Sequence, residues 1–168
     1  MLEASAGAGI AVLALVTLQR LAEVAFARRN ERRLMAQGAR EYAPEHYPAI
    51  VALHGAWLAG LWLMIDRAPL NLYWLAAYGA LQPLRLWVLA TLGGRWTTRI
   101  VVAPGAPPIK TGPYRFMAHP NYAIVVAEIF SLPMVFGLHA YAVVFSLLNG
   151  CLLAIRIRAE NRAWRLRV

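Results

Sequence analysis

The feature that most constrains this chain is a series of long apolar runs that contain few charges. The first, from about residue 6 to residue 27, can cross a hydrocarbon core as a helix, which takes about 20 residues. With 60% hydrophobic and 15% charged residues, the chain is too apolar for a soluble domain of 168 residues. We therefore predict one all-α domain over residues 1–168, a polytopic membrane bundle of about five transmembrane helices that ends in a helical hairpin. The later runs cover about residues 49–65, 70–92, 123–136 and 138–157.

The segments between the runs predict where helices continue and where they stop. Residues 28–38 keep good helix formers and end on a glycine, so we expect the first helix to protrude into water as far as Gly38. A short polar turn is expected at Asp66–Pro69, and a tight hairpin at Gly137. The N-terminal residues lack the pattern of a cleaved secretory signal, so we expect the first run to remain as a membrane anchor.

Basic residues predict the orientation in the membrane. They cluster after the first run, after the third run and at the C-terminus, whereas the connections after the second and fourth runs carry only Arg67. Because short loops rich in Lys and Arg stay on the cytoplasmic side, we expect the N-terminus outside and the C-terminus inside. The same clustering beside apolar runs accounts for the net charge of +9, so the bilayer is the expected partner and nucleic acid is not.

Cysteine and metal-ligand patterns carry little function. The single cysteine, Cys151, lies in an apolar run, where we expect a buried small hydrophobic side chain. No spacing of His, Cys or carboxylate residues suggests a metal site.

Polar side chains recur at helical spacing inside the apolar runs. A charge near the centre of a span costs roughly 2.5–3.5 kcal/mol on insertion scales, so each is a candidate for a functional site. Residues at intervals of three or four share one face of a helix. One such face, in the third run, is expected to look into the bundle and comprises Asn71, Trp74, Tyr78, Gln82 and Arg85. Another, in the last run, comprises Asn149, Leu153, Arg156 and Glu160.

Each of these groups also has a structural interpretation. Arg20 and Glu23 are three residues apart and are expected to neutralise each other. Arg85 could pair with a carboxylate or contact an anionic ligand. Glu128 must meet a base from another helix, be protonated or touch a ligand. The candidate substrate contacts are Gln82, Arg85, Glu128 and Asn149.

One polar segment interrupts the apolar pattern: Lys110-Thr-Gly-Pro-Tyr-Arg-Phe-Met-Ala-His-Pro-Asn-Tyr122. With the hairpin after it and Arg156-Ile-Arg-Ala-Glu160, it resembles the isoprenylcysteine carboxyl methyltransferase family, integral membrane enzymes that use S-adenosylmethionine. The stretches Gln82-Pro-Leu-Arg-Leu-Trp87 and Arg95-Trp96 also resemble its small bacterial members. The resemblance covers the C-terminal half in its motifs and the N-terminal half in its hydropathy.

This resemblance implies a cofactor, a kind of acceptor and a set of site residues. The expected activity is S-adenosylmethionine-dependent methyl transfer to the carboxylate or phenolic hydroxyl of a lipophilic acceptor, at the cytosolic face of a bacterial plasma membrane. Arg156 and Glu160 are implied as catalytic residues. The chain carries Ala118 and Asn161 where the family commonly has Arg and a second Glu. The implied cofactor contacts are Lys110, Gly112, Pro113, Tyr114, His119, Pro120 and Tyr122.

Two other functions compete with this one. Membrane reductases of the sterol-reductase type share a similar C-terminal architecture and use NADPH, so the polar segment could serve hydride transfer. A non-catalytic membrane binding protein could use the polar faces only for helix association. The short chain and the spacing of Arg156 and Glu160 favour the methyltransferase.

Overall fold

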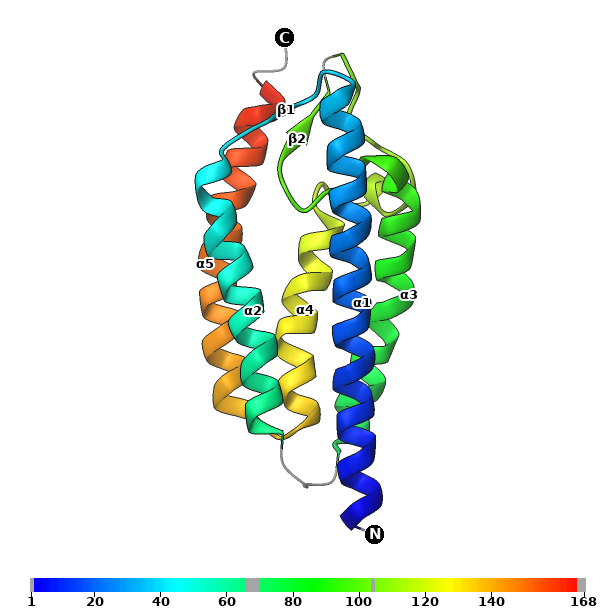
Figure 1. The fold of residues 1–168 in the computed structure, drawn as a ribbon, viewed down its shortest axis with the longest axis vertical. Coiled ribbons are helices and arrows are strands. Elements are labelled where there is room, and N and C mark those ends of the chain that lie inside the picture. Colours follow the sequence, from blue (N-terminus) through cyan, green and yellow to red (C-terminus); the bar gives the residue numbers. More distant parts are fainter. Residues whose placement is uncertain (1, 66–69, 104, 166–168) are drawn as a thin grey trace.

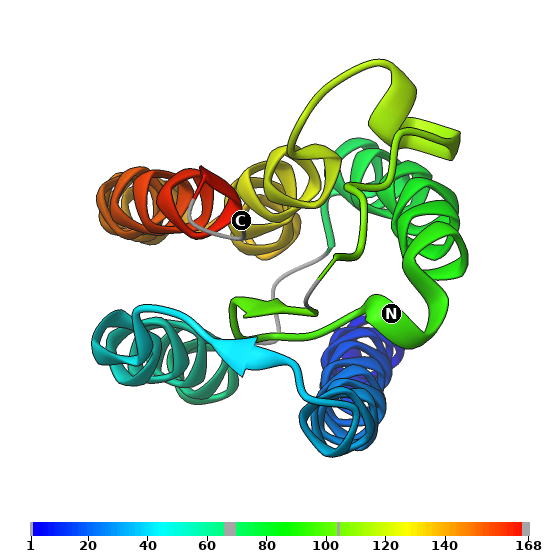
Figure 2. The ribbon, with the colours of Figure 1, turned by 90° about the horizontal axis from the view of Figure 1, so that it is seen from above.

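The structure, a computed structural model, describes residues 2–65, 70–103 and 105–165 (Figure 1). Over these residues the chain forms five α-helices that run along the long axis of the molecule (Figures 1 and 2). The prediction of an all-α bundle is therefore confirmed. The turn expected at residues 66–69 lies outside the described residues. The helices are α1 (Leu2–Ala36), α2 (Tyr47–Met64), α3 (Leu72–Leu92), α4 (Pro120–Val135) and α5 (His139–Arg165).

Three of the described helices are long and apolar enough to cross a membrane by length and composition, and they are found at Gly7–Ala36, Pro44–Met64 and His139–Arg165. A shorter apolar helix, α4, precedes α5, and Gly137 turns between them with a φ of +72°. Large apolar side chains remain exposed along these helices, as expected where lipid covers the protein; they include Leu15, Leu63 and Leu147. Cys151 is also exposed, so the expectation that it is buried was wrong: it lies on the outward face of α5.

Helix α1 continues well beyond its apolar run, as its sequence predicts. It ends at Ala36, and Gly38 follows with a φ of +85°, a left-handed conformation that glycine adopts without strain. The amide of Ala39 donates to the carbonyl of Leu34, which closes the end of the helix. The basic residues of this last part of α1 are therefore carried clear of the apolar run.

Short elements gather at one end of the bundle, where α1, α3 and α5 end and α4 begins (Figure 1). Strand β1 (Arg40–Glu41) pairs antiparallel with β2 (Val101–Val102), and three 3₁₀ turns accompany them: η1 (Pro44–His46), η2 (Gly93–Arg95) and η3 (Gly112–Arg115). The segments that carry the three basic clusters meet at this end, whereas the N-terminus lies at the other (Figure 1). The strand pair is too short to leave a periodic pattern in the sequence.

Helix α4 passes through successive layers of the interior. Its first turn carries Tyr122, and Ile124 then packs in a small apolar cluster with Ala27, Val88 and Trp96. Glu128 follows in a polar layer, and Leu132 belongs to the main apolar core at the far end. A polar layer thus separates two apolar ones. The main core comprises Leu13, Val16, Trp57, Leu61, Tyr78, Ile129, Leu132 and Val135.

Candidate active site

A cavity of about 860 Å³ lies between the connection from α3 to α4 and the last turns of α5. This volume is within the range of small-molecule sites, about 300–1,000 Å³. Segments far apart in the sequence form its walls: residues 95–103, residues 108–119, the first turn of α4 and the end of α5. Six residues expected at the site line it together: Lys110, Tyr114, His119, Tyr122, Arg156 and Glu160.

The side chains of Arg156 and Glu160 are joined through a tyrosine hydroxyl. Nε of Arg156 donates to Oη of Tyr122 at 2.8 Å, and that hydroxyl donates to Oε2 of Glu160 at 2.5 Å. Only 8% of Arg156 is exposed, so its charge is largely removed from water. The helical spacing explains the arrangement, because residues four apart on α5 share one face and the first turn of α4 packs beside it. Tyr122 therefore sets the relative position of the two expected catalytic groups.

The ring of His119 lies flat against Tyr122. The two ring centroids are 5.1 Å apart with planes 14° apart, and Nδ1 of His119 lies 3.7 Å from Oε2 of Glu160. His119 immediately precedes α4, which opens on Pro120, a residue that suits the first helical position because no intrahelical partner exists there for its missing N–H. The start of the helix thus fixes the imidazole next to the carboxylate.

The N-terminal helix supports the part of the cavity wall to which Thr97 and Arg99 contribute. Oε1 of Glu31 accepts hydrogen bonds from the backbone amides of Thr98 at 3.2 Å and Arg99 at 3.3 Å, and from the Thr98 hydroxyl at 3.1 Å. The carbonyl of Thr98, fixed in this way, accepts from Nη2 of Arg156 at 2.7 Å. The sequence did not point to Glu31 or Thr98. Glu31 lies in a basic stretch that resembles a surface segment, and Thr98 acts mainly through its backbone amide and carbonyl.

A second residue of α1 ties the same wall down. The side-chain amide of Asn30 donates to the carbonyls of Gly93 at 3.1 Å and Trp96 at 2.9 Å. Trp96 also lines the cavity. Buried amides are normally satisfied by hydrogen bonds, and these two bonds satisfy the buried side chain of Asn30. They also hold the end of α3 against α1.

Three of the expected cofactor residues, Gly112, Pro113 and Pro120, do not line the cavity. Pro113 and Pro120 are buried and shape the ends of η3 and α4. Gly112 has a φ of +55°, and a Cβ there would collide with Thr91 of α3. The segment can therefore lie close to α3 only with glycine at this position.

The charge of the cavity is mostly positive. Arg95, Arg99, Lys110, Arg115 and Arg156 line it, against the carboxylate of Glu160. Arg99 is paired with Glu41 at 2.7 Å. Burial and the negative charge of Glu160 raise the pKa of the Tyr114 hydroxyl, so it remains a neutral hydrogen-bonding group at neutral pH. Such a cavity can hold an anionic group beside Arg156.

The donor set also fits S-adenosylmethionine. Its carboxylate could pair with a cation such as Lys110, and its sulfonium could lie near the rings of His119 and Tyr122 and the Glu160 carboxylate. The aromatic side chain of Trp164, which lines the cavity and is only partly buried, could stack on a purine ring. Ala118 and Asn161 line the same cavity. Among residues 2–65, 70–103 and 105–165, no three His, Cys, Asp or Glu side chains come together as a metal site would need.

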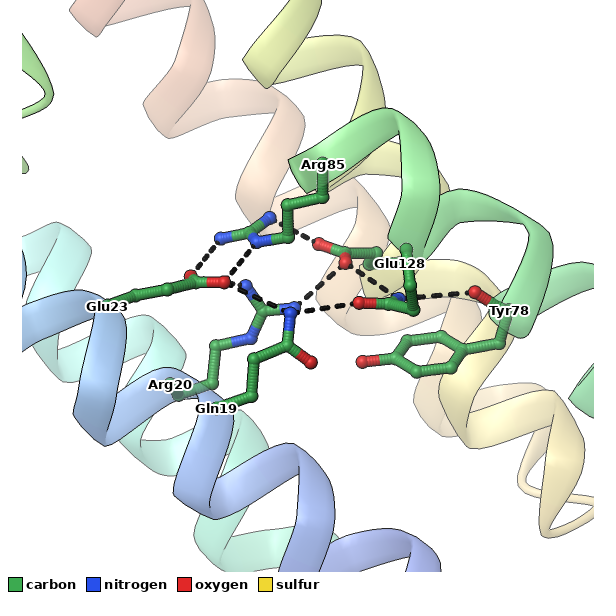
Figure 3. Close-up of polar contacts among 7 residues, drawn as sticks. Gln19, Arg20, Glu23, Tyr78, Arg85 and Glu128 are labelled. Carbon is green, nitrogen blue, oxygen red and sulfur yellow. Dashed lines mark hydrogen bonds and ion pairs between the residues drawn. The ribbon is translucent and has the colours of Figure 1, made fainter. Parts of the chain in front are cut away.

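Arg85 and Glu128, expected as substrate contacts, lie in a closed ring of charges apart from the cavity (Figure 3). Arg85 contacts Glu23 at 2.5 Å and Glu128 at 2.7 Å, while Arg20 contacts the same two carboxylates at 2.9 Å and 2.8 Å. Each arginine thus binds both glutamates, and the ring has no net charge. The expected pair of Arg20 and Glu23 is present, and Glu128 meets bases from two other helices.

Two glutamines connect this ring across the same helices. Gln19 donates to Glu23 at 3.1 Å (Figure 3). It also donates to Gln82 at 2.9 Å, and Gln82 donates to Glu128 at 3.2 Å. Asn149, 1% exposed on α5, does not line the cavity either. The structure therefore brings none of the four expected substrate contacts to the cavity wall, and three of them are hydrogen-bonded within the charged ring and its glutamines.

Comparison with known proteins gives the same family that the residues of the cavity resemble. Residues 74–165 match the model of the isoprenylcysteine carboxyl methyltransferase (ICMT) family. The chain is also 39% identical over 158 residues to YpbQ of Bacillus subtilis strain 168, described as an uncharacterized protein, with 90% of this chain and 94% of that protein covered. No solved structure matches the chain. The matched stretch contains Tyr122, Arg156 and Glu160, but not α1.

Proposed function

This chain belongs to the isoprenylcysteine carboxyl methyltransferase family, and from that membership we propose that it is a membrane methyltransferase acting on a lipophilic acceptor. The proposed reaction moves a methyl group from S-adenosylmethionine to the carboxylate or phenolic hydroxyl of a molecule with a prenyl or alkyl tail. The observation that carries the proposal is the hydrogen-bonded chain from Arg156 through Tyr122 to Glu160 at the wall of a cavity large enough for a small-molecule ligand.

Arg156 is the group that would position the acceptor. Its Nε and Nη2 are held by Tyr122 and by the carbonyl of Thr98. A guanidinium fixed at two points can form a charge-assisted hydrogen bond to an acceptor oxygen without losing further side-chain freedom. S-adenosylmethionine, when bound, supplies a methyl carbon attached to a positively charged sulfur. Holding the acceptor oxygen in line with that carbon is the main contribution expected of the protein.

Glu160 has a role that depends on the acceptor. A carboxylate is already ionised at neutral pH and needs no base, whereas a phenol, with a pKa near 10 by analogy with tyrosine, must lose a proton. We propose that Glu160 takes that proton when the acceptor is a phenol and orients Tyr122 and Arg156 when it is a carboxylate. Tyr114, His119 and Lys110 are then left to the cofactor.

The site would face the cytosol of a bacterium, with the N-terminus outside the plasma membrane. The basic clusters around the cavity support this orientation, because basic connections stay on the cytoplasmic side. A polar cofactor would then enter from water and the acceptor from the bilayer. For Arg85 and Glu128 we propose a packing role, since their hydrogen bonds are already made with each other and with α1.

Calorimetry on the purified protein in detergent tests the proposal. We expect S-adenosylhomocysteine to bind and NADPH not to bind. Binding of NADPH alone would replace the methyltransferase by a reductase, and binding of neither would favour a non-catalytic protein. A membrane lipid extract incubated with the protein and a methyl-labelled donor would then show whether the label enters an organic-soluble ester or ether.

A further inference from the structure

A pair of large apolar side chains is exposed on the connection that follows η3. Phe116 is 68% exposed and Met117 is 50% exposed, directly after Arg115. Neither lies in a membrane-crossing helix. Exposed neighbouring apolar side chains in a connection between helices usually mark a contact surface, because water is a poor environment for them.

The position of this pair along the bundle follows from its contact with α3. The rings of Phe116 and Trp87 meet edge to face with centroids 6.4 Å apart. Trp87 is itself 45% exposed, and the exposed Leu84 lies one helical turn before it on the same face. Phe116 thus extends the exposed apolar face of α3 near the end of that helix. Tryptophan residues are enriched at membrane interfaces, so Trp87 suits such a position.

The connection reaches outward rather than over the bundle. Seen from above, the later, yellow-green part of the connection from β2 to α4 lies beyond the ring of helices, on the side of α3 and α4 (Figure 2). The guanidinium of Arg115 lies 5.0 Å from the centre of the Phe116 ring, so a positive charge stands beside the apolar pair. An apolar pair with an exposed cation next to it matches the acyl boundary of a bilayer and the anionic headgroups above it.

We propose that residues 115–117 form a lipid-contacting surface, with Phe116 and Met117 in the acyl boundary and Arg115 on an anionic headgroup. The same two apolar residues also line the cavity. In the proposed arrangement this segment stands between the cavity and the bilayer. The proposal does not depend on the reaction that the cavity catalyses.

Spin labels at two methionines test the position of this surface. Met35, in the last turn of α1, is 48% exposed and Met117 is 50% exposed, so the two sites match in residue type and exposure. Met117→Cys and Met35→Cys would be labelled separately in a Cys151→Ala background and placed in vesicles containing phosphatidylglycerol. We expect the Met117 label to collide more with oxygen and less with a water-soluble nickel chelate than the Met35 label. Equal nickel accessibility at the two sites would overturn the proposal, as would a Met117 label shielded from both reagents by a second protein copy.

A charge variant tests the headgroup contact. In the labelled protein, we expect the oxygen-to-nickel ratio at Met117 to rise with the fraction of phosphatidylglycerol. Arg115→Gln should remove most of that rise. Arg158→Gln, which removes another exposed arginine, on α5, should leave that rise unchanged. The same loss in both variants would mean that only the overall charge matters and would overturn the assignment of Arg115 to a headgroup.

Discussion

The Tyr122 hydroxyl donates a 2.5 Å hydrogen bond to the Glu160 carboxylate, and the same oxygen accepts a hydrogen bond from Arg156. Tyr122 stands in the first turn of α4, whereas the other two residues stand near the end of α5. One hydroxyl therefore joins the two arms of the hairpin at the wall of the cavity.

Tyr122→Phe should remove this junction and keep the ring that stacks on His119. Hydrogen bonds to charged groups contribute about 1.5–3 kcal/mol each, so the variant should lose stability and leave Arg156 less well held. Misplacement of a reacting group by about 1 Å can cost 10²-fold in rate, and we expect a loss of that order in methyl transfer. Tyr141→Phe is the control: its hydroxyl bonds the carbonyl of Trp57 at 2.7 Å, so it should lower the melting temperature without slowing turnover. Equal activity in the two variants would contradict the proposed role.

Arg156→Ala and Glu160→Gln should each abolish turnover while the protein remains folded. Both side chains line the cavity, and neither belongs to the apolar core. The expected loss is at least about 10²-fold, the lower range for a positioned acid or base. Arg158→Ala removes an exposed arginine from the same helix and should leave the rate unchanged. Rates would be followed by transfer of labelled methyl, with circular dichroism melting to verify folding; full activity in either cavity variant would exclude that residue from the reaction centre.

A substitution in the ring of Arg20, Glu23, Arg85 and Glu128 should lower the stability of the protein far more than a substitution in a surface ion pair. Glu128→Gln leaves the buried Arg85 and the partly exposed Arg20 facing one carboxylate, and removing one partner of a buried pair in this way costs about 3–5 kcal/mol. Glu41→Gln breaks the partly exposed pair with Arg99 and should cost about 1 kcal/mol or less. Denaturation of both variants in detergent measures the difference. Similar losses of stability would mean that the buried ring does not hold the helices together.

Gly112→Ala should disturb the cavity wall more than Gly105→Ala does. Both glycines have positive φ, +55° and +69°, so alanine at either site carries about 1–2 kcal/mol of backbone strain. Only at Gly112 would the added Cβ also meet Thr91; nothing lies within 4 Å of it at Gly105. We expect the Gly112 variant to bind S-adenosylhomocysteine more weakly as well as to melt earlier, and calorimetry on both proteins would show whether the affinities differ.

Much of the fold could be predicted because apolar length and charge placement are local properties of a sequence. The hairpin at Gly137, the long end of α1 and the gathering of basic segments at one end all follow from them. The two-residue strands could not be predicted, since pairing so short depends on where the helices place their ends.

The candidate site was also predictable only in part. The family resemblance predicted roles for Arg156, Glu160 and residues between Lys110 and Tyr122, and six of these residues line one cavity. For Arg85 the sequence left a choice between a carboxylate partner and an anionic ligand. The packing of α1 against α3 decides this choice, because it places the Glu23 carboxylate against the Arg85 guanidinium. The bridging role of Tyr122 was also invisible, because it depends on the distance between two helix ends.

The carboxylate of Glu31 makes the stretch that matches the family dependent on α1. The stretch that matches the family begins at residue 74, after α1 and α2, yet the Thr98 carbonyl that holds Arg156 is anchored by a side chain of α1. A fragment from residue 74 onward would keep every residue of the hydrogen-bonded chain and lose the anchor of one of its ends. The N-terminal helix thus supports the cavity wall as well as having the length and composition of a membrane span. If the proposed activity is correct, a helix exchanged from a relative should preserve it only when a carboxylate stands at this position.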